Sequence, residues 1–202
     1  MQPDSSHPDP AATKTSTLDR AMRHGPVDYE QAASLVGALC EKAARAHDEG
    51  LAYGDLSPAN VTITQDLDLT ITIEPLKGPL ADIDHVSTDY IAPEVLAGGP
   101  CTPRSDVYSL ARILYRLITG TTPEGESPPA PSSISKTPRV LDTIIKRATS
   151  VAPNDRISSA EKLANDLRQT AQTRPAIKGP EAPITPIRKS HEIAEIGRAS
   201  CR

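Results

Sequence analysis

The sequence contains neither phenylalanine nor tryptophan, and only five tyrosines stand among its 202 residues. Aromatic rings normally supply much of the buried area in the core of a globular domain. A chain of this length can still enclose a core, because a domain of about 150 residues buries roughly two thirds of its surface on folding. We therefore expect one domain with tails, whose core is built mainly from Leu, Ile, Val and Ala.

Cysteine, net charge and long apolar runs are scarce as well. The three cysteines, Cys40, Cys101 and Cys201, lack the spacing of metal ligands or of a disulfide framework, which favours a reducing compartment. No apolar run reaches the length of a membrane span. The net charge of −4, with both signs mixed along the chain, gives no footprint for nucleic acid. These absences predict a cytoplasmic protein with protein partners, no nucleic-acid partner and no membrane segment in this chain.

Both ends of the chain are polar and rich in proline. Residues 1–14 have the composition of a disordered lead-in, and residues 171–202 have that of a disordered linker or tail. Within the tail, residues 195–202 resemble the translation of a DNA-sequencing adapter and are set aside as an artefact of processing. A single domain is expected over residues 15–170.

Apolar residues at helical spacing predict that this domain is mainly helical. One long helix is expected after Asp28, which can cap it, and Gly50 marks its end. A second long helix begins at Ser105 and stops at Gly120, with a broad apolar face typical of a central buried helix. Two shorter helices are predicted over residues 18–24 and 139–149.

Two further patterns complete the expected elements. Ser158 and Glu161 fit a capping box that opens a last helix. Residues 61–64 and 69–73 alternate β-branched residues around a polar turn, which predicts one small β-hairpin.

Two segments carry a resemblance to a known family. The first reads Tyr53-Gly54-Asp55-Leu56-Ser57-Pro58-Ala59-Asn60, and the second reads Tyr90-Ile91-Ala92-Pro93-Glu94. They resemble the catalytic loop and the Ala-Pro-Glu segment of bacterial Ser/Thr protein kinases. The resemblance implies a mainly α fold, the C-terminal lobe of a protein kinase with one small β-hairpin, and it leaves the N-terminal, ATP-binding lobe missing from this chain.

The resemblance also assigns roles to two residues of the first segment. Asp55 takes the place of the catalytic Asp, which accepts the proton of the substrate hydroxyl, so it is a candidate for a vestigial base. Asn60 takes the place of the magnesium-binding Asn and is a candidate metal ligand. Each has a structural alternative, because a loop Asp or Asn can instead hydrogen-bond nearby backbone.

Three other residues match family positions that are structural. Glu94 and Arg156 are expected to form a buried or half-buried ion pair that joins the Ala-Pro-Glu segment to the loop before the last helix. Asp106, at the start of the central helix, is expected to hold the backbone of the catalytic loop through charge-assisted hydrogen bonds.

Several departures from the family pattern affect the chemistry. Ser57 stands where the family has a Lys in the catalytic loop. The Asp-Phe-Gly motif should lie about a dozen residues after Asn60, where the chain reads Ile73-Glu74-Pro75-Leu76. An Asp-Phe-Gly is impossible in a chain without Phe, and no Gly-rich loop or strand Lys precedes Leu18.

These departures predict a degenerate Ser/Thr protein kinase-like domain, a catalytically inactive pseudokinase that acts as a binding or scaffold module in signalling. The alternative is a fragment of an active kinase that transfers the γ-phosphate of ATP to protein Ser or Thr. No cofactor is expected in this chain, and MgATP is expected only if the N-terminal lobe is encoded upstream.

Overall fold

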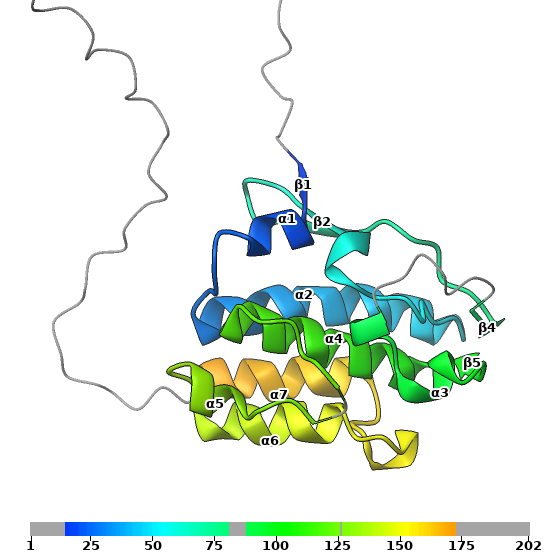
Figure 1. Ribbon diagram of the computed structural model, residues 1–202. Coiled ribbons are helices and arrows are strands. Elements are labelled where there is room, and N and C mark those ends of the chain that lie inside the picture. The colour runs from blue at the N-terminus through cyan, green and yellow to red at the C-terminus, as the bar shows by residue number, and fades with distance from the viewer. Residues whose placement is uncertain (1–14, 81–87, 126, 173–202) are drawn as a thin grey trace, which may run out of the picture.

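The computed structural model describes residues 15–80, 88–125 and 127–172, so the predicted lead-in and most of the predicted tail lie outside the described residues. The longer helices, stacked in layers in Figure 1, are α2 (Tyr29–Asp48), α4 (Pro103–Thr119), α6 (Arg139–Ala148) and α7 (Ala160–Gln172). The shorter helical segments are α1 (Leu18–Met22), α3 (Pro93–Leu96), α5 (Pro131–Ile134) and the 3-10 turns η1 (Pro58–Asn60), η2 (Thr88–Tyr90) and η3 (Pro153–Asp155). The mainly helical architecture confirms the prediction from apolar spacing.

The helix α4 lies at the centre of the packed helices. Its first turn is fixed by a capping box, in which Thr102 Oγ1 accepts from the Ser105 N–H at 3.2 Å and Ser105 Oγ accepts from the Thr102 N–H at 2.8 Å. The helix therefore begins at Pro103, two residues before the predicted start, because proline is well tolerated in a first turn. Almost every residue from Ser105 to the end is buried, and α2, α6 and α7 pack around it.

The predicted hairpin is present but belongs to a larger sheet. Strands β2 (Val61–Ile63) and β3 (Leu69–Ile71) pair in antiparallel fashion, and β1 (Ser16–Thr17) pairs with the other side of β2. The expectation of a lone hairpin was therefore incomplete, because a two-residue strand shows no periodicity that sequence reasoning can detect.

A second strand pair lies near the catalytic-loop segment. Strand β4 (Gly78–Pro79) pairs with β5 (Pro100–Cys101), with Gly78 opposite Cys101. The pair joins two short stretches of chain between which η2 and α3 lie in the sequence. It also places Cys101 against Gly54 of the catalytic-loop segment.

The start of α7 differs by one residue from the prediction. Ser159 Oγ, not Ser158, accepts the hydrogen bond from the Lys162 N–H at 3.1 Å, and the helix starts at Ala160. The predicted capping box of Ser158 and Glu161 is therefore wrong. Ser158 and Ser159 carry the same side chain, so either could cap the helix. Packing of the apolar face of the helix decides which of the two serines takes the cap position.

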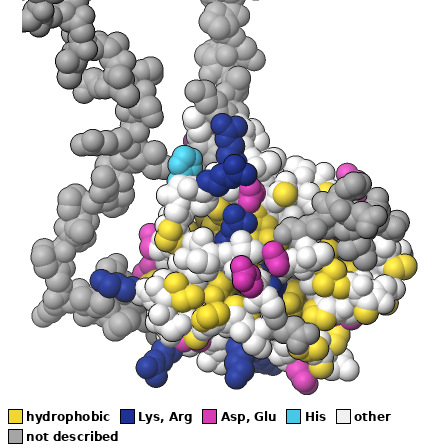
Figure 2. Space-filling view, in the orientation of Figure 1, with side chains coloured by type: hydrophobic (Ala, Val, Ile, Leu, Met, Phe, Trp, Pro, Cys, Tyr) yellow, Lys and Arg dark blue, Asp and Glu magenta, His cyan; other side chains and the backbone are white. Residues whose placement is uncertain are grey.

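The core confirms the expectation drawn from composition. Leu, Ile, Val and Ala from α2, α4, α6 and α7 form most of the main buried cluster, which also contains Tyr90 and Tyr115. Tyr108 lies in a second, smaller cluster with Ile91, Val95 and Cys101. On the face shown in Figure 2, the exposed hydrophobic side chains form separate groups among polar and charged ones.

Candidate functional site

The segment from Tyr53 to Asn60 forms a tight loop between α2 and β2. The candidate base, Asp55, and the candidate metal ligand, Asn60, are hydrogen-bonded to each other. Asn60 Nδ2 donates to Asp55 Oδ2 at 2.8 Å and to the Asp55 carbonyl oxygen at 3.0 Å. The Asn60 N–H closes the η1 turn by donating to the Ser57 carbonyl oxygen at 3.0 Å. Asn60 thus ties the loop together, which is the structural alternative considered from the sequence.

The Asp55 carboxyl is partly buried, and its two oxygens differ. Oδ2 accepts from Asn60, whereas Oδ1 is buried with no hydrogen-bond partner among the described residues. Burial raises the pKa of Asp55 to about 6, and the hydrogen bond from Asn60 offsets part of the shift. The carboxyl is therefore a stronger base than an exposed Asp, and one of its acceptor sites is unused.

Asp106 anchors the start of this loop to α4. Its Oδ1 accepts from the Gly54 N–H at 2.8 Å, and its Oδ2 accepts from the Tyr53 N–H at 2.9 Å. The contact predicted from the sequence is therefore present. His47, near the end of α2, adds a partner that sequence reasoning did not anticipate, because its Nε2 lies 2.8 Å from Asp106 Oδ2. Asp106 is fully buried, so these three donors compensate for the loss of its hydration.

The expected ion pair between Glu94 and Arg156 is also present. The guanidinium makes a bidentate contact with the carboxylate, with Nη1 2.6 Å from Oε1 and Nη2 2.6 Å from Oε2. The Arg156 side chain is fully buried, whereas that of Glu94 is 23% exposed. The guanidinium also lies over the Tyr108 ring, 5.0 Å from its centroid. Its remaining donors bind the carbonyl oxygens of Ser150, Val151 and Arg104.

This arrangement of loop, anchoring Asp and buried ion pair agrees with a comparison by sequence. The family model described as "Protein kinase domain" matches residues 11–179 of the chain. The chain belongs to the protein kinase domain family. The matched range includes both segments in which the sequence resembles a kinase catalytic loop and Ala-Pro-Glu segment.

Curated relatives are bacterial Ser/Thr kinases. The chain is 33% identical to the serine/threonine-protein kinase PkaA of Streptomyces coelicolor, with 77% of this chain and 32% of PkaA covered. It is 28% identical to PknL of Mycobacterium tuberculosis, with 75% of this chain and 43% of PknL covered. A probable serine/threonine-protein kinase of Corynebacterium efficiens is 29% identical, with 84% of this chain and 31% of that protein covered. The chain thus spans less than half of the length of these relatives.

Solved structures of kinase domains share the fold. The crystal structure of the PknI kinase domain of Mycobacterium tuberculosis superposes with a TM-score of 0.65 at 26% sequence identity. The superposition covers 78% of this chain and 62% of that domain. A double mutant of the same domain gives a TM-score of 0.64 at 29% identity.

Within this kinase fold, two positions that normally hold charge have lost it. Ser57, at the place of the catalytic-loop Lys, is buried. The hydrogen bond from the Thr72 N–H to the Asn60 carbonyl oxygen, 2.9 Å, fixes the alignment of β3 with the loop. Ile73 is the next residue after Thr72. Counted along the chain from Asn60, this apolar residue stands where the family has the second metal-binding acid, the Asp of its Asp-Phe-Gly motif. Glu74, one residue later, is exposed.

The position of the family's Arg before the catalytic Asp is also closed to a side chain. Gly54 has a φ of 74°, in the left-handed region that favours glycine. A Cβ atom on Gly54 would lie 2.1 Å from Cys101 Sγ. The sequence alone could not reveal the contact with Cys101, because β5 reaches the loop only through the tertiary fold.

The residues present do not fit the metal and nucleotide of an active kinase. The family binds two magnesium ions through an Asp and an Asn and neutralises phosphate with lysines. The described residues offer Asp55 and Asn60 without the second acid or the loop Lys, and they contain no group of three acidic, His or Cys side chains that could hold a metal ion. Among the described residues there is also no helix with the length and hydropathy to cross a membrane.

Proposed function

We propose that this kinase-like domain is a catalytically inactive pseudokinase that acts as a protein-binding module in signalling. The observation that carries the proposal is the replacement of two charged catalytic positions by Ser57 and Ile73, inside an intact kinase-like core. Phosphoryl transfer depends mainly on positioning and on neutralising negative oxygens, and these two positions supply charge for that purpose in the family.

The pattern of loss and retention supports this function. Removing one preorganised charge donor typically lowers a rate by about a hundred- to a thousandfold, so the combined loss leaves little activity. Meanwhile Asp106 still holds the loop and Arg156 still pairs with Glu94. Contacts that maintain the shape of the lobe are thus kept, while charges that serve the reaction are replaced.

The experiment measures binding of MgATP and transfer of phosphate by the 202-residue chain. We expect no magnesium-dependent thermal shift with ATP and no labelled phosphate on the chain or on a general protein substrate. A magnesium-dependent shift that disappears in Asp55→Asn or Asn60→Ala would contradict the proposal. Glu74→Gln is a matched control, since it removes one exposed acid near the loop without touching the Asp55–Asn60 pair.

A second candidate, a fragment of an active Ser/Thr kinase, is favoured by one observation. Asp55 Oδ1 is buried and has no partner within the described part of the chain, which leaves an acceptor of the type that takes the proton of a substrate hydroxyl. Phosphate transfer by the chain joined to its upstream sequence, lost in Asp55→Asn, would support this candidate. We rank it second because neither Ser57 nor Ile73 is changed by adding sequence at the N-terminus.

A further inference from the structure

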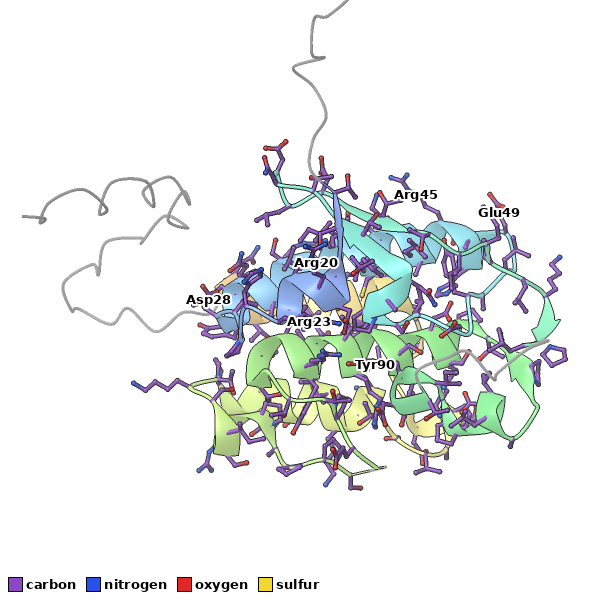
Figure 3. All side chains as sticks on the ribbon, turned by 45° about the horizontal axis from the view of Figure 1, so that its top comes forward. Arg20, Arg23, Asp28, Arg45, Glu49 and Tyr90 are labelled. Atoms are coloured by element: carbon purple, nitrogen blue, oxygen red, sulfur yellow. The ribbon has the colours of Figure 1, made fainter. Side chains whose placement is uncertain are left out.

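A groove runs between the C-terminal half of α2 and the strand β3. It has a volume of about 330 Å³. One wall is formed by Lys42, Arg45, Ala46 and Glu49 of α2, and the other wall and one end are formed by Thr70, Ile71, Tyr53 and Pro75. Figure 3 shows Arg45 and Glu49 side by side along the helix, beside the strands. The groove is separate from the Asp55–Asn60 pair.

The strand that borders the groove has one unpaired backbone edge. Thr62 lies opposite Thr70 in the ladder, and the hydrogen bonds Thr72 N–H to Asn60 and Thr64 N–H to Asp68 flank this pair, each 2.9 Å. Because antiparallel ladders alternate, the N–H and C=O of Thr70 point toward β2. Those of the next residue, Ile71, point away from the sheet, and they have no backbone partner among the described residues. An unpaired edge of this kind can accept an added strand.

On the helix side of the groove, two positive side chains are followed along α2 by a negative one. Arg45 lies three residues after Lys42, and Glu49 lies four residues after Arg45. This spacing places the three side chains on one face of α2. None of the three takes part in an ion pair with another described residue. The groove is therefore positive at the Lys42 and Arg45 end and negative at the Glu49 end. Ala46 and Ile71 add apolar surface to the lining of the groove.

We propose that this groove binds an extended segment of a protein partner. The segment pairs with the exposed Ile71 edge of β3 and places an acidic side chain between Lys42 and Arg45. The backbone pairing supplies affinity and the charges supply specificity. The proposal rests on the binding role proposed above, for which it names the surface and the chemistry of the partner, and it does not depend on whether phosphate transfer has been lost.

The test is a selection of random peptides of about ten residues on the immobilised full chain. In parallel, the same pool is selected on the double variant Lys42→Glu/Arg45→Glu. The wild type is expected to enrich acidic peptides, and the double variant is expected to enrich basic ones. The best acidic peptide should bind the double variant at least about tenfold more weakly than it binds the wild type. Binding should also slow hydrogen exchange at the Ile71 amide, which a purely electrostatic contact at the helix would leave unchanged.

Arg139→Glu is the matched control, because it reverses one exposed charge on α6, away from the groove. It should select the same peptides as the wild type. If no peptide is enriched, or if enriched peptides bind wild type and double variant alike, the groove proposal is overturned. In the second case the binding role survives at another surface. A dimer that the double variant dissolves would make a second copy of the chain the occupant and would also overturn it.

Discussion

Cys101 fills the space that a side chain at Gly54 would need. The thiol sulfur lies 2.1 Å from the site of a Cβ on residue 54, and the φ of 74° at Gly54 disfavours any other residue. The loop and β5 therefore depend on each other. The family's Arg at this position cannot be restored by one substitution.

Gly54→Ala is expected to destabilise the fold by about 2–4 kcal/mol, from left-handed strain and from overpacking against the thiol. Gly98 separates the two causes, because its φ is 82° and nothing lies within 4 Å of its Cβ site. Gly98→Ala should therefore cost only about 1–2 kcal/mol. Cys101→Ala should recover part of the loss in a double variant, as measured by urea denaturation. Equal costs for the two alanine variants would show that the thiol exerts no steric effect.

Arg156→Ala is expected to lower the free energy of unfolding by about 3–5 kcal/mol, because the carboxylate of Glu94 loses a fully buried bidentate partner. Several backbone carbonyl groups lose their donor in the same substitution. The control is Arg168→Ala, which removes an exposed ion pair with Glu41 and should cost no more than about 1 kcal/mol. Chemical denaturation of both variants gives the comparison. Similar losses would mean that the buried pair contributes no more than a surface pair.

Asp106→Ala is expected to cost about 1–3 kcal/mol, since it leaves the N–H groups of Tyr53 and Gly54 buried without an acceptor. Hydrogen exchange should accelerate at these two amides more than elsewhere in the chain. Asp48→Ala serves as the control, because Asp48 is an exposed acid at the end of α2. Unchanged exchange at residues 53 and 54 in Asp106→Ala would show that the loop is held by other contacts.

Asp55 should make stability depend on pH. Its pKa is raised to about 6 in the folded state, chiefly by burial, so between about pH 4 and pH 6 the folded state binds more protons than the unfolded state. The contribution of Asp55 therefore becomes less favourable as the pH rises through this window, and is constant above it. Asp55→Asn keeps an acceptor for Asn60 and removes the penalty.

We expect Asp55→Asn to be more stable than the wild type by about 1 kcal/mol above pH 6, a figure reduced for solvent screening of this partly exposed group. The stability difference between the two proteins should shift in favour of the variant as the pH rises from 4 to 6. Thermal melts across pH 4 to 8 measure it, with Asp66→Asn in the exposed hairpin turn as the control. A difference that does not change with pH would mean that the pKa of Asp55 is the same in both states.

Local patterns in the sequence determined the helices, the hairpin and the family. Apolar spacing, the cap at Asp28 and the glycine stops act within a few turns of chain, so they predict α2 and α4 with little help from distant residues. The family segments likewise placed Asp106 near the loop and Glu94 near Arg156. Their catalytic and metal-binding roles at Asp55 and Asn60 stay predictions.

Tertiary structure alone decided the features that join distant segments. The pairing of β1 with β2, the position of Cys101 against Gly54 and the hydrogen bond between His47 and Asp106 link residues far apart in the chain. The groove between α2 and the free edge of β3 belongs to the same group. Such contacts depend on how helices and strands pack, and packing is set by the shapes of the complete buried surfaces. No short stretch of sequence contains that information.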